Sequence, residues 1–230
     1  MIVALDLDDT LYPEITYVES GFRAVARAAA VELGVDEEES LNVLRASLAA
    51  HGRGRQLDDL LEHWQAHTRG RLRRLLAVYR GHRPELKLPG ASRSVLARLC
   101  ADGHSLYLVT DGNARVQAAK VDALGVRPLF RHCYLTGRYG AAAAKPGTKV
   151  FELMLARERA AARDLVYVGD DPSKDFVGVR ALGGATIRVL TGRCAAVRAA
   201  EGYDADVAVA SLAAVPETVA ALASPGQTER

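Results

Sequence analysis

Residues 2–12 read IVALDLDDTLY, a short apolar run that ends in three aspartates within four positions. The apolar part, Ile2 to Leu7, is typical of a buried strand. Carboxylates packed this closely repel one another unless a cation neutralises them. Asp6 and Asp8 stand two positions apart, so both side chains can lean toward one site while Leu7 points to the core. Oxygen ligands of this kind suit Mg²⁺, although aspartates at a strand end also serve as loop or helix caps.

The composition is that of a soluble globular protein. The chain has 230 residues, of which 49% are hydrophobic and 25% are charged. At about 150 residues per domain this length predicts one domain with a large insertion, or two small domains. The net charge is +2, with 30 basic and 28 acidic residues. Such a balance gives no reason to expect a nucleic acid or a membrane surface as partner.

The pattern of apolar and polar residues changes near residue 90. Residues 14–83 are rich in Ala, Leu, Arg and Glu and predict several helices, one of them starting at the acidic run that Asp36 begins. Beyond Gly90, helical patterns alternate with short apolar runs, which predict strands at 105–109, 132–135, 165–168 and 185–189. Strands separated by helices of this length imply a parallel sheet.

We therefore predict an α/β fold with a parallel-sheet core and an inserted helical domain. The core domain is predicted to contain residues 1–12 and 88–223, and the helical insertion residues 13–87. The polar segment 224–230 is predicted to be a loose tail. A last helix is expected over residues 212–222, and a shorter one over 174–182.

Three further polar segments follow predicted strands: TDGN at residues 110–113, Lys145 before a proline, and GDDPSKD at residues 169–175. A threonine beside a glycine turn at a helix start can bind phosphate oxygens, but it can also be an ordinary cap. The lysine could meet a phosphoryl group, or it could be solvated surface. One acidic strand end is common. Two in one chain, with Thr110 and Lys145 between them, are less easily explained by capping, because ligands of open α/β sheets bind beyond the carboxyl ends of strands.

The location of the protein is predicted from its cysteines and its first residues. Cys100, Cys133 and Cys194 are far apart and odd in number, which favours reduced thiols and a cytoplasmic protein. The first ten residues have no basic region and meet acidic residues at once, unlike a signal peptide. No apolar run reaches the length that a membrane span needs.

The series DLDDTLY, Thr110, Lys145-Pro146 and GDDPSKD resembles, in order and spacing, the four motifs of the haloacid dehalogenase superfamily. The resemblance covers about residues 3–190. It implies a Rossmann-like core and, for most members, Mg²⁺-dependent phosphate-ester hydrolysis with an aspartate nucleophile. The turn at 88–90 and the insertion after Tyr12 resemble the subgroup with a helical cap of the C1 type.

The resemblance also implies roles for the residues that react. Asp6 would be the nucleophile that forms an aspartyl-phosphate. Asp8 would be the general acid and base, first for the leaving alkoxide and then for water. Thr110, with the backbone amides of Asp111 and Gly112, would hold the phosphoryl oxygens.

The charges around the phosphate follow the same resemblance. Lys145 would neutralise charge on the nucleophile and phosphate, and Asp175 would orient that lysine. The implied Mg²⁺ ligands are Asp6, the main-chain carbonyl of Asp8 and Asp170, with Asp171 as a further candidate. These roles require the side chains at 6, 8, 145 and 170 to converge around one divalent cation.

Two features of the motifs bear on the reaction. The second motif more often reads Ser/Thr-Asn, whereas Asp111 follows Thr110 here, and this acid suits a phosphate site only if its carboxylate points elsewhere. The acid at Asp8 favours phosphate esters over carbon–halogen bonds, because a halide leaves without a proton. A phosphomutase needs the same first motif, so that alternative stays open, as does a non-catalytic binding or regulatory protein of this fold.

The substrate is expected to be a small phosphorylated metabolite, either a nucleoside monophosphate or a sugar phosphate. Residues 51–83 contain eight arginines and few acids. They could attract an anionic substrate, or they could be the solvated faces of helices. Trp64 could stack on a base, but a lone tryptophan in a helical bundle is more often part of the core.

Overall fold

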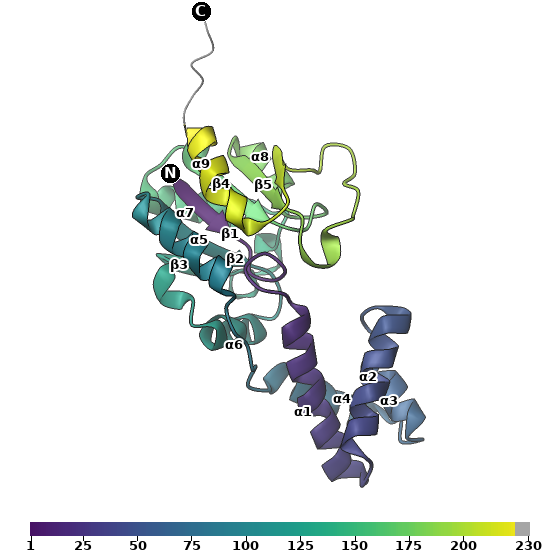
Figure 1. The fold of residues 1–230 in the computed structure, drawn as a ribbon. Coiled ribbons are helices and arrows are strands. Elements are labelled where there is room, and N and C mark those ends of the chain that lie inside the picture. The colour runs from purple at the N-terminus through teal and green to yellow at the C-terminus, as the bar shows by residue number, and fades with distance from the viewer. Residues whose placement is uncertain (224–230) are drawn as a thin grey trace, which may run out of the picture. The chain divides into compact units, whose positions relative to one another are not determined.

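The computed structural model describes residues 1–223, and the chain divides into two compact units (Figure 1). One unit contains residues 1–14 and the chain from Lys87 onward, and the other contains residues 15–86. Glu14 belongs to the first unit, where its amide donates a hydrogen bond of 2.9 Å to the carboxylate of Asp9. The segment 224–230, where the sequence predicts a loose tail, lies outside the described residues.

Among the described residues, a six-stranded parallel sheet forms the centre of the first unit. Its strands are β1 (Ile2–Leu5), β2 (Ser105–Thr110), β3 (His132–Leu135), β4 (Leu165–Gly169), β5 (Ala185–Val189) and β6 (Val207–Val209). Its helices are α5 (Gly90–Ala101), α6 (Ala114–Leu124), α7 (Lys149–Glu158), α8 (Val177–Leu182) and α9 (Val215–Ala223). The predicted α/β class with a Rossmann-like parallel sheet is confirmed.

The order of the strands across the sheet is β3-β2-β1-β4-β5-β6. Ile2 of β1 lies opposite Ser105 of β2 on one side and Leu165 of β4 on the other. The chain thus builds the sheet outward from β1 first in one direction and then in the other. In open α/β sheets, ligands bind beyond the carboxyl ends of the strands at such a switch point. Asp6, which follows β1, stands at this position.

Three elements are shorter than the sequence predicts. β1 ends at Leu5 because the chain then turns, and the amide of Leu11 donates to the carbonyl of Leu7 at 3.0 Å. α8 begins at Val177, later than predicted, because a turn whose amides bond to the carbonyl of Asp171 precedes it. The predicted last helix also begins late, since residues 212–214 form a 3-10 turn before α9.

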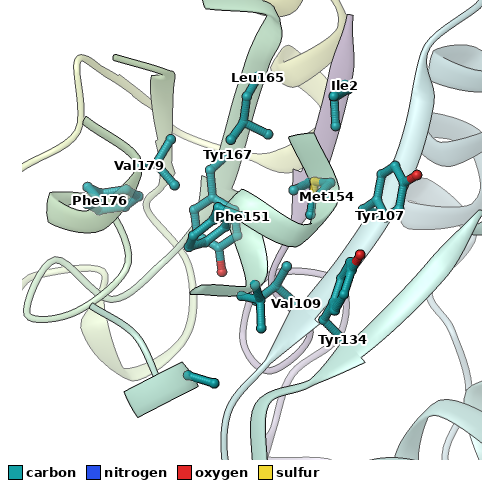
Figure 2. Packing of buried hydrophobic residues seen from close by; sticks show 13 residues of the cluster. Ile2, Tyr107, Val109, Tyr134, Phe151, Met154, Leu165, Tyr167, Phe176 and Val179 are labelled. Carbon is teal, nitrogen blue, oxygen red and sulfur yellow. The ribbon is translucent and has the colours of Figure 1, made fainter. Parts of the chain in front are cut away.

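Helices cover both faces of the sheet. Figure 2 shows Phe151 and Met154 of α7 and Val179 of α8 packed with Tyr107 and Tyr167 of the strands on one face. On the other face α5 and α9 contact each other (Figure 1). The rings of Phe151 and Tyr167 meet edge to face, with centroids 5.2 Å apart. Burying side chains of this size stabilises the fold by about 1.5–3 kcal/mol each, so the strand ends rest on a rigid base.

The second unit is helical. It contains α1 (Ile15–Leu33), α2 (Glu37–His51), α3 (Gln56–His63) and α4 (Arg69–Gly81). Its core includes Phe22, Leu44 and Leu60, which come from the first three helices. Asp36 caps α2, because its carboxylate accepts the amide of Glu39 at 2.7 Å, and this predicted helix start is confirmed.

Several of the arginines in this unit are paired. Arg71 and Arg74 both contact Glu32, and Arg55 contacts Asp59 at 3.1 Å. Glu32 joins α1 to α4 through its two arginines, whereas Arg55 and Asp59 lie one turn apart at the start of α3. They agree with the interpretation of solvated helix faces.

Trp64 belongs to the packing of the helical unit. Its ring packs against the core of that unit, and its indole N–H donates to the hydroxyl of Ser40 at 3.1 Å. The neighbouring His63 bonds to Glu39 at 2.9 Å. The interpretation of Trp64 as a core residue therefore fits its contacts.

The three cysteines are free, with Cys194 buried, Cys133 half-buried and Cys100 exposed. Within residues 1–223, none of the helices has both the length and the apolar character needed to cross a bilayer.

Candidate active site

The candidate site lies where the central strands end. Asp6 follows β1, Thr110 closes β2 and Asp170 follows β4, and these three strands are neighbours in the sheet. The amide of Asp6 still donates to the carbonyl of Val168 in β4 at 2.9 Å, which fixes the start of the loop. Residues more than a hundred positions apart are thereby brought to one edge of the sheet.

Three buried carboxylates form a cluster at this edge. Asp6, Asp170 and Asp175 each offer an oxygen atom, and these atoms lie within 4.8 Å of one another. In the described part of the chain, no other group of three or more histidine, cysteine or acidic side chains is this close together. The sequence predicted that the side chains at 6, 8, 145 and 170 converge. Those at 6, 145 and 170 do, whereas the carboxylate of Asp8 is bonded to Lys120 of α6 instead.

The electrostatics of the cluster are those of a cation site. Burial, followed by the charges of Asp6 and Asp175, raises the pKa of Asp170 from 3.8 to about 8. Burial likewise raises the pKa of Asp6 to about 6, although the Lys145 ammonium lowers it. Carboxylates that resist ionisation in this way gain from a divalent cation between them. An all-oxygen donor set of this size fits Mg²⁺.

Lys145 is the buried cation of the cluster. Its Nζ lies 2.8 Å from Asp6 Oδ1 and 2.7 Å from Asp175 Oδ1, and it donates to the Tyr167 hydroxyl at 2.9 Å. Burial lowers the pKa of Lys145, but the charges of Asp175 and Asp6 raise it by more, well above its usual value. The ammonium therefore stays charged beside Asp6. Tyr167 joins the apolar core to the site, since its ring packs in that core.

Asp8 lies in a separate hydrogen-bond network. The Tyr12 hydroxyl donates to Asp8 Oδ1 at 2.6 Å, and the amide group of Gln117 donates to Oδ2 at 3.0 Å. Lys120 Nζ lies 2.8 Å from both oxygens. Burial raises the pKa of Asp8, but the Lys120 charge and these hydrogen bonds outweigh it and hold that pKa below its usual value.

The side chains of Thr110 and Asp111, at the end of β2, both accept hydrogen bonds. Thr110 Oγ1 accepts a hydrogen bond from Gln117 Nε2 at 2.6 Å. The carboxylate of Asp111 accepts the Thr136 hydroxyl at 2.7 Å and the amide of Lys145 at 3.2 Å. The acid that departs from the usual motif thus orders the loop that carries the lysine.

The residues after Asp111 start a helix. Asn113 caps α6, because its side-chain oxygen accepts the amides of Arg115 at 3.0 Å and Val116 at 3.3 Å. Gly112 has a φ of 121°, a backbone conformation that favours glycine. The ordinary-cap interpretation therefore describes Asn113.

Asp171 has partners that differ from those of Asp170. Its Oδ1 accepts the amide and hydroxyl of Ser173, at 3.1 and 2.6 Å, and its Oδ2 contacts Arg193 at 3.1 Å. Its own amide donates to Asp175 Oδ2 at 2.9 Å. Asp170 is the one whose carboxylate lies in the cluster, so the geometry separates the two neighbouring acids that the sequence left as alternatives.

Sequence reasoning gave no role to four residues around Asp8 and the loop behind it: Tyr12, Gln117, Lys120 and Asp9. Gln117 and Lys120 are buried polar residues three positions apart in α6, and that spacing after a polar strand end was the available signal. Asp9 has a φ of 56° and its carboxylate accepts the amides of Glu14 and Arg193. Nothing in its sequence context distinguished it from its acidic neighbours.

The parallel sheet with polar residues at its central strand ends belongs to a known class of hydrolases. A family model described as haloacid dehalogenase-like hydrolase matches residues 1–183, which include all four polar segments. The chain belongs to this family, as the sequence predicts, and it is therefore an enzyme of the hydrolase class.

The chain also resembles known proteins along most of its length. It is 31% identical over 196 residues to the glyceraldehyde 3-phosphate phosphatase of Methanocaldococcus jannaschii, which is 83% of this chain and 85% of that one. It is 30% identical over 200 residues to the ribulose-1,5-bisphosphate 5-phosphatase of Halopiger xanaduensis, covering 80% and 82%.

Solved structures share the fold at lower identity. A HAD-hydrolase of Bacillus subtilis bound to magnesium has a TM-score of 0.66 and 14% identity, covering 95% of this chain and 97% of that one. A 2-haloacid dehalogenase of Pseudomonas syringae has a TM-score of 0.64 and 23% identity, covering 96% and 99%.

Proposed function

We propose that this protein is a Mg²⁺-dependent phosphatase that hydrolyses small sugar phosphates through an aspartyl-phosphate on Asp6. The observation that carries the proposal is the cluster of Asp6, Lys145, Asp170 and Asp175, with Asp8 two residues after the first carboxylate. Two relatives are phosphatases of glyceraldehyde 3-phosphate and of ribulose-1,5-bisphosphate, which favours the sugar phosphates among the predicted substrates.

The first half of the reaction transfers the phosphoryl group to the protein. A carboxylate oxygen of Asp6 forms a bond to phosphorus as the ester P–O bond breaks, and the leaving alkoxide takes a proton from Asp8. Asp8 must take up that proton before this step, because Lys120 and its hydrogen bonds favour the carboxylate form. Lys145, at 2.8 Å from Asp6, offsets negative charge as the transition state forms. The Thr110 hydroxyl and the amides of Asp111 and Gly112 hold the phosphoryl oxygens.

The second half returns the nucleophile. Water attacks phosphorus, the bond between phosphorus and Asp6 breaks, and the Asp8 carboxylate takes the proton of the water. The sum is ester and water to alcohol and phosphate. Mg²⁺, held by Asp6, Asp170 and the main-chain carbonyl of Asp8, would supply electrostatic stabilisation of the phosphoryl charge. That the helical unit acts as a cap and selects the substrate stays a prediction.

The proposal is tested by phosphate release from glyceraldehyde 3-phosphate, ribulose-1,5-bisphosphate, AMP and an aryl phosphate, each with Mg²⁺ and with a chelator. We expect Mg²⁺-dependent turnover that is highest on the sugar phosphates and lost in Asp6→Asn. Asp122→Asn, an exposed acid paired with Arg127, serves as the matched control and should retain full activity.

Two results would contradict the proposal. One is an absence of metal-dependent release from every substrate, which would favour a binding or regulatory protein. The other is undiminished turnover in Asp6→Asn. Slow net hydrolysis that a sugar bisphosphate accelerates would indicate the phosphomutase alternative instead.

A further inference from the structure

Lys120 is a buried lysine that the proposed mechanism does not use. Its side chain is 4% exposed, and it lies within α6, outside the four polar segments that follow the strands. A buried ammonium is costly unless carboxylates compensate it. Its function is therefore found in the acids that it contacts.

Those acids are Asp8 and Glu14. Lys120 Nζ lies 2.8 Å from both oxygens of Asp8 and 3.4 Å from Glu14 Oε1. Tyr12 and Gln117 donate to Asp8 as well, so both of its oxygens are bonded. The carboxylate is thus held by three side chains, of which only Lys120 contacts both oxygens.

We propose that Lys120 is a positioning residue that fixes the carboxylate of Asp8 in the orientation needed for proton transfer to the leaving group. The inference rests on the proposed function, in which Asp8 is the general acid and base. Lys120 would touch neither substrate nor phosphate. It acts by restricting the rotation of Asp8, with Glu14 as its second anchor.

The placement of this lysine follows from the helix. α6 begins directly after the loop that follows Thr110, and Asn113 fixes that start as its cap. Gln117 lies one turn before Lys120 and donates to Thr110 Oγ1 at 2.6 Å as well as to Asp8. One rigid helix therefore sets the acid–base carboxylate relative to the threonine proposed to hold phosphate.

A purely structural role would use the same contacts, with Lys120 balancing the charges of two buried acids so that the unit folds. The two roles differ in what the reaction loses. A loss of positioning affects substrates whose leaving group needs a proton, because misplacing a catalytic group by about 1 Å can cost about 100-fold in rate. A general loss of structure affects all substrates alike.

The experiment compares kcat/KM of Lys120→Met and the wild type on two substrates, with Mg²⁺ present. Glyceraldehyde 3-phosphate releases an alkoxide that needs a proton, whereas 4-nitrophenyl phosphate releases a phenolate that does not. We expect kcat/KM to fall about 100-fold for the first and less than about 5-fold for the second. Lys120→Arg should restore part of the loss, because a guanidinium can bind both oxygens of a carboxylate.

Lys87→Met is the matched control, since Lys87 is exposed, and it should leave both values unchanged. An equal fall on both substrates in Lys120→Met, or no fall, would overturn the proposal. Absence of turnover in the wild type would refute the proposed function instead. Crystal structures of the wild type and Lys120→Met then decide the positioning itself: a displaced Asp8 carboxylate supports it, and an unmoved one refutes it.

Discussion

Asp170→Asn should make the metal-free protein more stable at neutral pH. The pKa of Asp170 is about 8 in the folded protein, against an ordinary value of 3.8, because the side chain is buried near Asp6 and Asp175. Below about pH 4 this carboxyl is protonated in both states and has no effect. As the pH rises from 4 to 8 the unfolded chain releases the proton while the folded protein retains it, so the free energy of unfolding falls. Each unit of pH over which only the unfolded chain is ionised costs about 1.4 kcal/mol, so the roughly three units from pH 4 to pH 7 give about 4 kcal/mol.

The assay is urea unfolding of the wild type and Asp170→Asn in a chelator, from pH 5 to pH 8, followed by circular dichroism. The advantage of the variant should be about 2 kcal/mol at pH 5 and should grow to about 4 kcal/mol at pH 7. Mg²⁺ should reverse the order, because it stabilises the protein that binds it. A difference that does not grow with pH, or a variant less stable at pH 7, would refute the reasoning.

Asp171→Asn is the control with the opposite sign. Burial raises the pKa of Asp171, but Ser173, Lys174 and Arg193 outweigh burial and hold it below its usual value. The ionised carboxylate of Asp171 therefore stabilises the protein at pH values above its pKa in the unfolded chain. This stability is lost as the pH falls through its lower pKa in the folded protein. The variant should be less stable than the wild type at pH 7, and the difference should shrink on acidification.

Three other changes are expected to have definite results. Lys145→Met leaves two buried carboxylates without their cation, so stability should fall by about 3–5 kcal/mol in urea unfolding and turnover by at least about 1000-fold. In Gly169→Ala, the new Cβ would clash with Asp175 Oδ2, and the resulting displacement should lower kcat by about 100-fold in a phosphate-release assay. Trp64→Phe removes the hydrogen bond to Ser40 and should lower the free energy of unfolding by about 1 kcal/mol, measured by thermal unfolding, while kcat stays unchanged. A lowered kcat would show that Trp64 affects the chemistry.

The sequence predicted the architecture well because its signals are local and repeated. Strands in a parallel sheet are buried on both faces and appear as short apolar runs, and the polar residues that end them mark one edge of the sheet. The sequence alone therefore places Asp6, Thr110 and Asp170 at the same edge of the sheet. Helix starts such as Asp36 were predictable for the same reason, since a cap is a contact between near neighbours.

The rest of the site depends on contacts between distant segments. The carboxylate of Asp111 turns to Thr136 and to the amide of Lys145, and no pattern around residue 111 specifies that direction. Lys120 looks like a surface lysine in a helix until its helix is docked beside Asp8. Side-chain direction at such positions is set by tertiary packing, which a single sequence does not display.

The position of β1 has a consequence for how the protein folds. β1 is an inner strand of the sheet, and its two partners begin far along the chain, at Ser105 and Leu165. Each edge of β1 therefore stays unpaired until a distant segment reaches it, while the helical unit, whose contacts are local, can form earlier. The carboxylates of Asp6 and Asp170, at the ends of these strands, are consequently brought together late in folding.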